Sequence, residues 1–216
     1  MATAALGGTS VAIAQQVPAP HCRSAEPLVR IAELPEASGV AVSRRTPGRL
    51  WAHNDSGEPV LVALDARGSV TGRVRLSGAR IEDWEAIAVG ACPSGSCIYI
   101  ADIGDNDAKR KRVTIHRIAE PSSENSAVVK DTFHATYPDG AHDAETLLVA
   151  PDGRLFIVTK GETGAVGLYR FPRELRPGAT HRLERVEDLP RPHIRRPGLD
   201  QHPQRGAIVP PLLVLV

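Results

Sequence analysis

Side chains that carry oxygen recur at matched positions in three similar segments of the chain. The segments read SGVAVS (Ser38–Ser43), EAIAVG (Glu85–Gly90) and ETLLVA (Glu145–Ala150), and each begins with such a residue. Carboxylates that converge repel one another unless a cation neutralises them or their pKa values rise. Oxygen ligands without nitrogen or sulfur favour Ca²⁺ over zinc. The pattern therefore indicates either a calcium site or a set of acids with raised pKa values.

The candidate metal ligands stand at the start of one of these segments, two residues before it, near the end of the strand that follows it, or in the acidic run that begins there. They are Glu85, Glu145, Asp83, Asp143, Asn54, Asp102 and Asp105. Asp102 and Asp105 belong to the acidic run DIGDND, in which Gly104 permits a tight backbone, although the run lacks the ligand spacing of an EF-hand. Acids at strand entries also accept hydrogen bonds from turn amides and hold strands together. Both roles remain open, and they can coexist.

Catalysis by a side-chain nucleophile has little support in the sequence. The Gly-x-Ser-x-Gly, Walker and His-Glu-x-x-His motifs are absent. His53 and His142 stand near the acids and are weak candidates for general bases, because a single His near a turn is more often a hydrogen-bonding or surface group. The basic run Lys109–Arg112 is predicted to be an exposed hairpin tip, with a phosphate-binding patch as the alternative.

The same three segments open a repeated unit of four short strands. The later strands are expected at Leu50–Asp55, Val60–Leu64 and Val70–Leu76, at Ile98–Ile103, Val113–Ile118 and Asp131–Tyr137, and at Leu155–Lys160, Val166–Phe171 and Arg182–Leu189. Turn sequences between them, such as Pro151-Asp152-Gly153, predict antiparallel meanders. Quartets that recur about every 40–60 residues are typical of β-propeller blades, whereas a β-sandwich does not need matched quartets. We therefore expect an all-β partial propeller of about three four-stranded blades.

The repeated unit sets the expected boundaries of the chain's segments. The partial propeller is assigned to residues 21–189, and an additional strand at Leu28–Leu34 is expected to fasten the ring as the outer strand of a last blade that this sequence lacks. Residues 1–20 are interpreted as a signal-peptide remnant or a disordered leader. Residues 190–216, rich in Pro, Arg, His and Gly before an apolar end, are interpreted as an aberrant tail from a frameshifted or truncated gene, or as a disordered tail.

The cysteines favour export of the protein. Cys92 and Cys97 flank a four-residue turn between two predicted strands, a spacing that can close a disulfide loop; a zinc knuckle and free thiols are the alternatives. Cys22 is left without an assigned partner. Together with the small-x-small pattern Ala12-Ile13-Ala14, this predicts a secreted or periplasmic protein.

Composition narrows the range of partners. The 216 residues include 26 basic and 25 acidic side chains, a net charge of +1, which argues against nucleic acid as a partner. No apolar run reaches the roughly 20 residues of a membrane span. The remaining expectations are a small-molecule or protein ligand and self-association through open sheet edges.

The repeats resemble a known family. The pairs SGVAVS with LWAHNDSG, DWEAIAVG with YIADIGDN, and HDAETLLV with LFIVTKG are similar to six-bladed propellers of the TolB-like, SdiA-regulated and esterase-like-phytase type, over residues 28–189. The resemblance implies the fold more than an activity. We expect an extracytoplasmic, truncated binding or scaffold protein for a ligand or divalent cation. The alternative is a Ca²⁺-dependent hydrolase of the phosphoesterase or lactonase type that uses the channel carboxylates, so enzymatic activity is left open.

Overall fold

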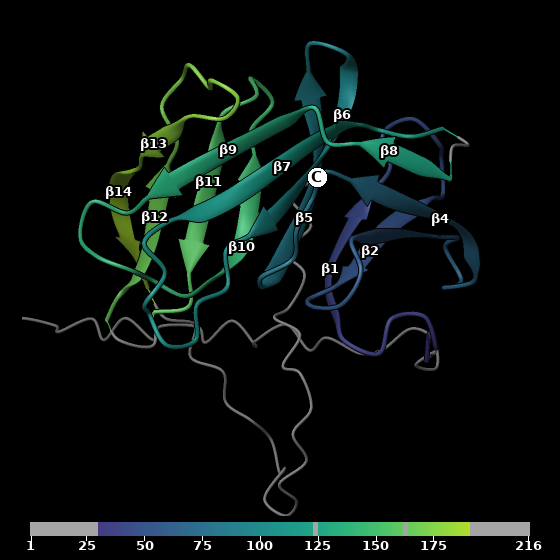
Figure 1. The fold of residues 1–216 in the computed structure, drawn as a ribbon, viewed down its shortest axis with the longest axis horizontal. Coiled ribbons are helices and arrows are strands. Elements are labelled where there is room, and N and C mark those ends of the chain that lie inside the picture. Colours follow the sequence, from purple (N-terminus) through teal and green to yellow (C-terminus); the bar gives the residue numbers. More distant parts are fainter. Residues whose placement is uncertain (1–29, 123–124, 162–163, 191–216) are drawn as a thin grey trace, which may run out of the picture. The chain divides into compact units, whose positions relative to one another are not determined.

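The computed structural model describes residues 30–122, 125–161 and 164–190, and these residues form strands and turns without a helix. The all-β prediction is therefore confirmed. The strands make three sheets, here named A, B and C (Figure 1). The interpretations of residues 1–20, of Cys22 and of residues 191–216 fall outside the described residues. Within the described part of the chain, no helix is long and apolar enough to cross a membrane.

Each sheet contains one of the predicted quartets as an antiparallel meander. Sheet A holds β1 (Ala37–Val42), β2 (Leu50–Asn54), β3 (Val60–Leu64) and β4 (Val70–Ser77). Sheet B holds β5 (Trp84–Cys92), β6 (Gly95–Asp102), β7 (Val113–Ala119) and β9 (Asp131–Thr136). Sheet C holds β10 (Ala144–Val149), β11 (Leu155–Thr159), β12 (Val166–Arg170) and β14 (Glu184–Leu189).

Two further strands cross from one meander to the preceding sheet. β8 (Ser126–Val128) lies in the connection between β7 and β9 but pairs in parallel with β4 of sheet A. β13 (Thr180–Arg182) lies in the connection between β12 and β14 but pairs in parallel with β9 of sheet B. Each exchanged strand covers an edge that would otherwise expose unpaired backbone groups.

Sheet B is buried on both faces. Along β6, Tyr99 and Ala101 pack against sheet C, whereas Ile98 and Ile100 pack against sheet A, as the two-residue period of a strand requires. The first strands of the three meanders are neighbours, because β5 contacts both β1 and β10 (Figure 1). The first residues of β1, β5 and β10 therefore lie close to one another.

The predicted strand at Leu28–Leu34 is wrong over its described residues. Ile31 to Leu34 forms a turn in which the Leu34 amide donates to the Ile31 carbonyl. Its apolar side chains pack on Ala52, Val62 and Leu64, on the face of sheet A turned away from sheet B. Pro35 directly follows, and Pro cannot donate a hydrogen bond to a neighbouring strand.

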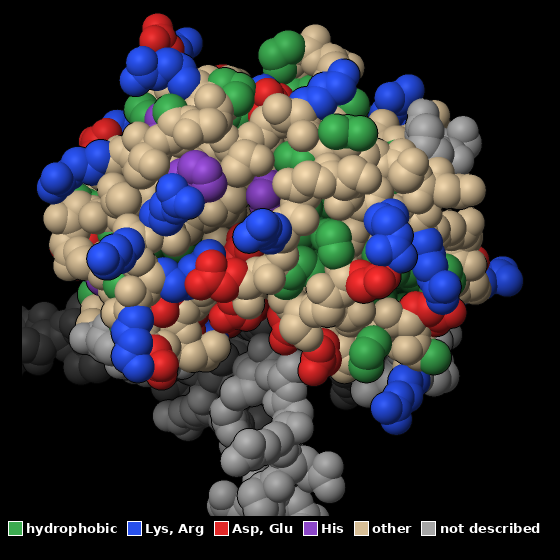
Figure 2. All heavy atoms as spheres, viewed as in Figure 1, with side chains coloured by type: hydrophobic (Ala, Val, Ile, Leu, Met, Phe, Trp, Pro, Cys, Tyr) green, Lys and Arg blue, Asp and Glu red, His purple; other side chains and the backbone are tan. Residues whose placement is uncertain are grey.

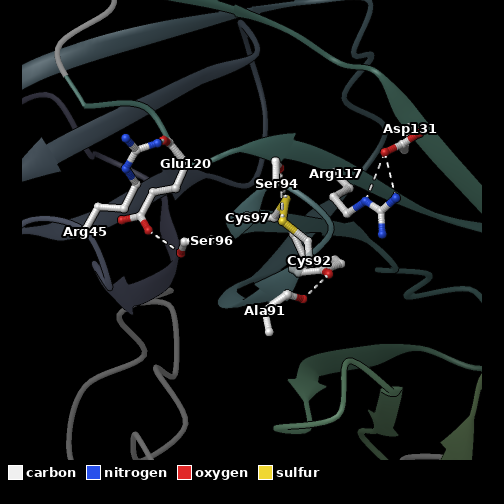
Figure 3. Close-up of a disulfide and its surroundings, with 10 residues drawn as sticks. Arg45, Ala91, Cys92, Ser94, Ser96, Cys97, Arg117, Glu120 and Asp131 are labelled. Atoms are coloured by element: carbon white, nitrogen blue, oxygen red, sulfur yellow. Dashed lines mark hydrogen bonds and ion pairs between the residues drawn. A yellow bond between two sulfur atoms is a disulfide. The ribbon is translucent and has the colours of Figure 1, made fainter.

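The predicted disulfide between Cys92 and Cys97 is present, with a Cα–Cα distance of 5.8 Å (Figure 3). It closes the β5–β6 hairpin, whose turn uses Gly95 at a φ of 97°. A disulfide is typical of proteins that fold in an oxidising compartment.

Candidate ligand and cation site

The three matched residues of the repeat occupy the same structural position. The pairing of the first and second strands shifts by one residue at Ser38 in sheet A, at Glu85 in sheet B and at Glu145 in sheet C. Such a β-bulge redirects one side chain out of the regular alternation of the strand. Because β5 lies between β1 and β10, the three redirected side chains are brought close to one another.

Ser38, Glu85 and Glu145 form a chain of polar contacts across the three sheets. The Ser38 hydroxyl donates to Glu85 Oε2 at 2.7 Å. The Glu145 carboxyl group is the next neighbour of Glu85 and acts on its pKa through charge and side-chain contact. Burial raises the pKa of Glu85 to about 8, and the negative charge of Glu145 adds to the effect, against the hydrogen bond from Ser38. The expectation of converging acids is thus met by both glutamates.

Lys160 neutralises one side of this acidic cluster. Its Nζ lies 2.7 Å from Asp143 Oδ2 and 2.5 Å from Glu145 Oε1. Burial acts to lower the pKa of Lys160, but the two carboxylates outweigh it and raise that pKa. Lys160 lies directly after β11, and the sequence analysis did not single it out as part of the site. Figure 2 shows acidic side chains with basic ones among them near the ends of β1, β5 and β10.

Asp83 completes the cluster from the residue before β5. Burial raises its pKa, and the charges of Asp143 and Asp55 raise it further. Gly104 faces this acid closely: a Cβ placed there would fall on the Asp83 carboxylate and 2.8 Å from Glu85 Oε1. A side chain at residue 104 would therefore displace both carboxyl groups, which explains the glycine in the DIGDND run.

The other candidate ligands are occupied by backbone groups. Asp102 accepts hydrogen bonds from the amides of Glu82 and Asp83 at 2.9 and 3.1 Å. Asp105 accepts from the amides of Lys109 and Arg110 at 2.9 and 2.7 Å. These carboxylates take the structural role that the sequence left open, since they fix the turns around β5 and β6.

Asn54 and Asp143 are also engaged with backbone. The Asn54 side chain accepts from the Glu36 amide at 3.0 Å and donates to the Glu33 carbonyl at 3.2 Å. Asp143 Oδ1 accepts from the Asp105 amide at 2.8 Å, which links the approach to β10 with the loop after β6. The remaining predicted ligands are Asp83, Glu85 and Glu145, whose carboxyl groups interact with other side chains of the cluster.

The basic run Lys109–Arg112 differs from its prediction as an exposed hairpin tip. Lys109 is exposed, but the side chain of Arg110 is only 12% exposed and lies 2.8 Å from Asp102 Oδ1. Its second guanidinium nitrogen lies 3.1 Å from Glu82. Arg110, one of the four basic residues of the run, is therefore buried and pairs with Asp102 and Glu82.

His53 lies in the core. It is 0% exposed, stacks edge-on against Trp84 with ring centroids 5.6 Å apart, and sits 2.9 Å from the Asn54 carbonyl through Nδ1. Burial lowers the pKa of His53 to about 4, so the ring is neutral at physiological pH. Its position favours a packing role over that of a general base.

His142 lies in a different environment, beside a cavity of about 270 Å³ between the β6–β7 loop and β14. Its Nε2 is 3.0 Å from Asp139 Oδ1 and 3.0 Å from the Tyr169 hydroxyl, which donates to Asp139 Oδ2. Arg185 also binds Asp139. His142 is thus the better placed of the two histidines for contact with a ligand.

Within the described residues, no group of three or more His, Cys, Asp or Glu side chains has the arrangement of a metal site. The ammonium of Lys160 stands between two of the acids instead. Comparison of the sequence with protein-family models and with curated proteins finds no match. The interpretation of the site therefore depends on its geometry.

Replacement of Glu85 by Gln should flatten the pH dependence of stability. The folded protein keeps the Glu85 proton up to a pKa of about 8, whereas the unfolded chain releases it near 4.5, so rising pH through this window destabilises the wild type. Glu85→Gln has no proton to lose. Between pH 4.5 and 9, the free energy of unfolding of the variant should rise by about 2 kcal/mol relative to that of the wild type. A fully buried group would contribute ~1.4 kcal/mol for each unit of pKa shift, and the effect is smaller here because water reaches the site.

Urea unfolding of both proteins at pH 4.5, 7 and 9 measures this difference. Glu187→Gln, at an exposed position on β14, is the matched control and should follow the wild type at each pH. An identical pH slope in Glu85→Gln and the wild type would show that Glu85 ionises normally in the folded protein.

Proposed function

We propose that this chain is part of a β-propeller that acts as an extracytoplasmic binding module, and that its first strands present Glu85, Glu145 and Asp83 to a divalent cation, with calcium as the first candidate. The observation that carries the proposal is the shared bulge position, which directs Ser38, Glu85 and Glu145 toward one another from three successive sheets. Convergence of equivalent residues on a common axis is what blades of a propeller produce. It also supports the sequence resemblance to six-bladed propellers.

The state of the acids supports binding. Burial, and after it the charges of neighbouring carboxylates, raises the pKa values of Glu85 and Asp83, and a bound cation would stabilise the ionised carboxylates against both effects. Carboxylate oxygens suit Ca²⁺. The cation has two competitors, the Glu85 proton and the Lys160 ammonium. Binding should therefore be weak near neutral pH and stronger above pH 8.

The disulfide Cys92–Cys97 supports the assignment to a secreted or periplasmic location. The carboxylates that bind backbone amides, Asp102 and Asp105, support a rigid scaffold beneath the cation site. A rigid scaffold that carries loops at one end suits a binding protein for a small molecule or another protein.

Calcium should raise the melting temperature, and more so at pH 9 than at pH 7. With 10 mM CaCl₂ and a dissociation constant of about 1 mM at pH 9, mass action stabilises the fold by about 1.4 kcal/mol, or about 3–6 °C. Differential scanning calorimetry with CaCl₂ against NaCl of equal ionic strength measures the shift. Glu85→Gln should lose most of it, and Glu187→Gln should keep it. Equal melting temperatures with and without calcium at both pH values would refute the cation site.

A hydrolase is the second candidate, and one observation favours it. Glu85 has a pKa of about 8 beside Glu145, an arrangement in which one carboxyl group can donate a proton while the other accepts one. Turnover of p-nitrophenyl phosphate or of a simple lactone that is lost in Glu85→Gln but retained in Glu187→Gln would support this candidate over a binding module.

A further inference from the structure

One position just after the second strand of each meander is equivalent in the three sheets. In each sheet the backbone amide at this position donates to the carbonyl of the residue two before the bulge. The pairs, donor first, are Asp55 and Glu36 in sheet A, Gly104 and Asp83 in sheet B, and Lys160 and Asp143 in sheet C, with N–O distances of 3.0, 3.2 and 2.9 Å. Sheet B reaches the position with one additional residue, Ile103, whose side chain is buried in the core. The shared hydrogen bond makes Asp55, Gly104 and Lys160 equivalent.

In sheet C this position supplies an ammonium group to a pair of carboxylates. The Nζ atom of Lys160 lies 2.7 Å from Asp143 Oδ2 and 2.5 Å from Glu145 Oε1. The residues equivalent to this acidic pair in sheet B are Asp83 and Glu85, two before the bulge and at the bulge. Sheet C therefore shows, within the same molecule, which group such a pair of carboxylates binds.

Sheet B has the acidic pair but has a glycine in place of the lysine. A Cβ on Gly104 would fall on the Asp83 carboxylate and 2.8 Å from Glu85 Oε1, so a side chain at this position would begin beside both acids. Among the described residues, no ion pair joins Asp83 or Glu85 to a Lys or Arg side chain, and Arg110 pairs with other carboxylates. The cation that sheet C takes from its own chain therefore has no counterpart in the described part of sheet B.

We propose that Asp83 and Glu85 bind the primary ammonium group of a ligand, and that Gly104 determines this specificity. Because residue 104 has no side chain, the ammonium must come from the ligand. The inference rests on the proposed binding function of the cluster and names an alkylammonium as the ligand class, in competition with calcium for the same carboxylates. Two carboxylates suffice for an ammonium group, as in sheet C, whereas the described residues contain no group of three acids arranged for a metal.

The surroundings of the pair suit charge-assisted hydrogen bonds. Glu85 is 9% exposed, so its carboxylate is largely removed from water, and Asp83 is half-buried, so solvent reaches the pair from its side. Hydrogen bonds from an ammonium to a carboxylate are about twice as strong as those between neutral groups, and partial burial reduces their screening. A methylated ammonium without N–H groups cannot make these bonds, which gives the test its control.

The first test supplies the ammonium from the chain itself. Gly104→Lys and Gly104→Met introduce side chains of similar length, and only the first carries a charge. The φ of Gly104 lies outside the left-handed region, so the backbone accepts either side chain. Both variants displace the two carboxyl groups, but Gly104→Lys should then melt at least about 3 °C above Gly104→Met at pH 7, because its ammonium pairs with them. Equal melting temperatures would overturn the proposal.

The second test uses the wild type with two isomeric cations. Both n-butylammonium and tetramethylammonium have four carbon atoms and one positive charge, but only the first has N–H donors. With a dissociation constant of about 20 mM, n-butylammonium chloride at about 50 mM should raise the melting temperature by about 2 °C in EDTA. Tetramethylammonium chloride should not raise it. The response should be lost in Gly104→Lys and kept in Glu187→Gln.

A peptide arm identifies the source of the ammonium. An acetylated and amidated Gly-Lys-Gly peptide that binds at least about tenfold more tightly than n-butylammonium would assign the site to a lysine side chain, and equal binding would assign it to a free amine. Equal effects of the two isomers, or an undiminished response in Gly104→Lys, would overturn the inference. A response to calcium without one to n-butylammonium would also overturn it, while the proposed cation-binding function would stand.

Discussion

Glu120→Ala should destabilise the fold by about 3–4 kcal/mol, a fall in melting temperature of about 8–15 °C. Glu120 follows β7, is 1% exposed and joins sheets A and B. Its carboxylate accepts hydrogen bonds from Ser43 at 2.5 Å and from Trp51 Nε1 at 3.1 Å. It also accepts one from Ser96 at 2.5 Å (Figure 3). Removal of the carboxylate leaves the buried Ser43 hydroxyl and the buried Trp51 N–H without this acceptor, and each such donor costs about 1–3 kcal/mol.

The pKa of Glu120 predicts that the destabilisation caused by Glu120→Ala depends on pH. Burial acts to raise this pKa, but the hydrogen bonds from Ser43, Ser96 and Trp51 outweigh it and hold the pKa below its usual value. The stabilising contribution is therefore present at neutral pH and is lost as the pH falls through the folded-state value. The difference in the free energy of unfolding between the wild type and Glu120→Ala, measured by denaturant unfolding, should decrease toward pH 3.

Glu58→Ala is the matched control for Glu120→Ala. Glu58 lies in the turn before β3 and pairs with Arg75 of β4 at 2.7 Å, but their side chains are 69% and 58% exposed. Exposed pairs contribute about 0–1 kcal/mol. A loss in Glu120→Ala no greater than in Glu58→Ala would mean that Glu120 does not join the two sheets.

Lys160→Met should destabilise the protein by about 2–3 kcal/mol at pH 7. The substitution keeps most of the apolar stem and removes the ammonium that lies between Asp143 and Glu145, so that the acidic cluster loses its neutralising charge. Denaturant unfolding of the variant and the wild type at pH 7 measures this loss in the free energy of unfolding.

Lys160→Met also tests whether the Lys160 ammonium competes with calcium for the acidic cluster. With the ammonium gone, calcium should stabilise Lys160→Met more than it stabilises the wild type. Lys109→Met is the control, since Lys109 pairs with Asp107 at the surface with a side chain 77% exposed. If Lys160→Met has the stability of the wild type at pH 7, Lys160 does not neutralise the cluster.

The repeat allowed most of the fold to be predicted. Strand bounds such as Val60–Leu64 are predicted accurately because a run of five apolar residues stands between two turn sequences there. The convergence of Glu85 and Glu145 followed from their equal positions in the repeat. The exchanged strands β8 and β13 were missed, because each has three residues and a three-residue segment shows no periodicity.

Parts of the site could not be predicted because they depend on contacts between distant segments. Lys160 stood in the sequence as the last residue of a predicted strand, and nothing local indicates that its ammonium reaches Asp143 and Glu145. Arg110 belongs to a run of four cations, and a charge run does not reveal which member turns inward. Leu34 has the spacing of a strand residue, but the turn at Ile31 takes it onto sheet A.

The exchanged strands have a consequence for any attempt to transplant or duplicate one repeat. A cut between sequence units, just before β5 or β10, leaves β8 or β13 on the wrong fragment, and the preceding sheet loses its outermost strand. A fragment that contains every strand of a sheet instead has its boundaries inside the β7–β9 and β12–β14 connections. Modules recombined at those connections should keep every sheet intact, whereas modules divided at the meander boundaries should aggregate through the bared edges of β4 and β9.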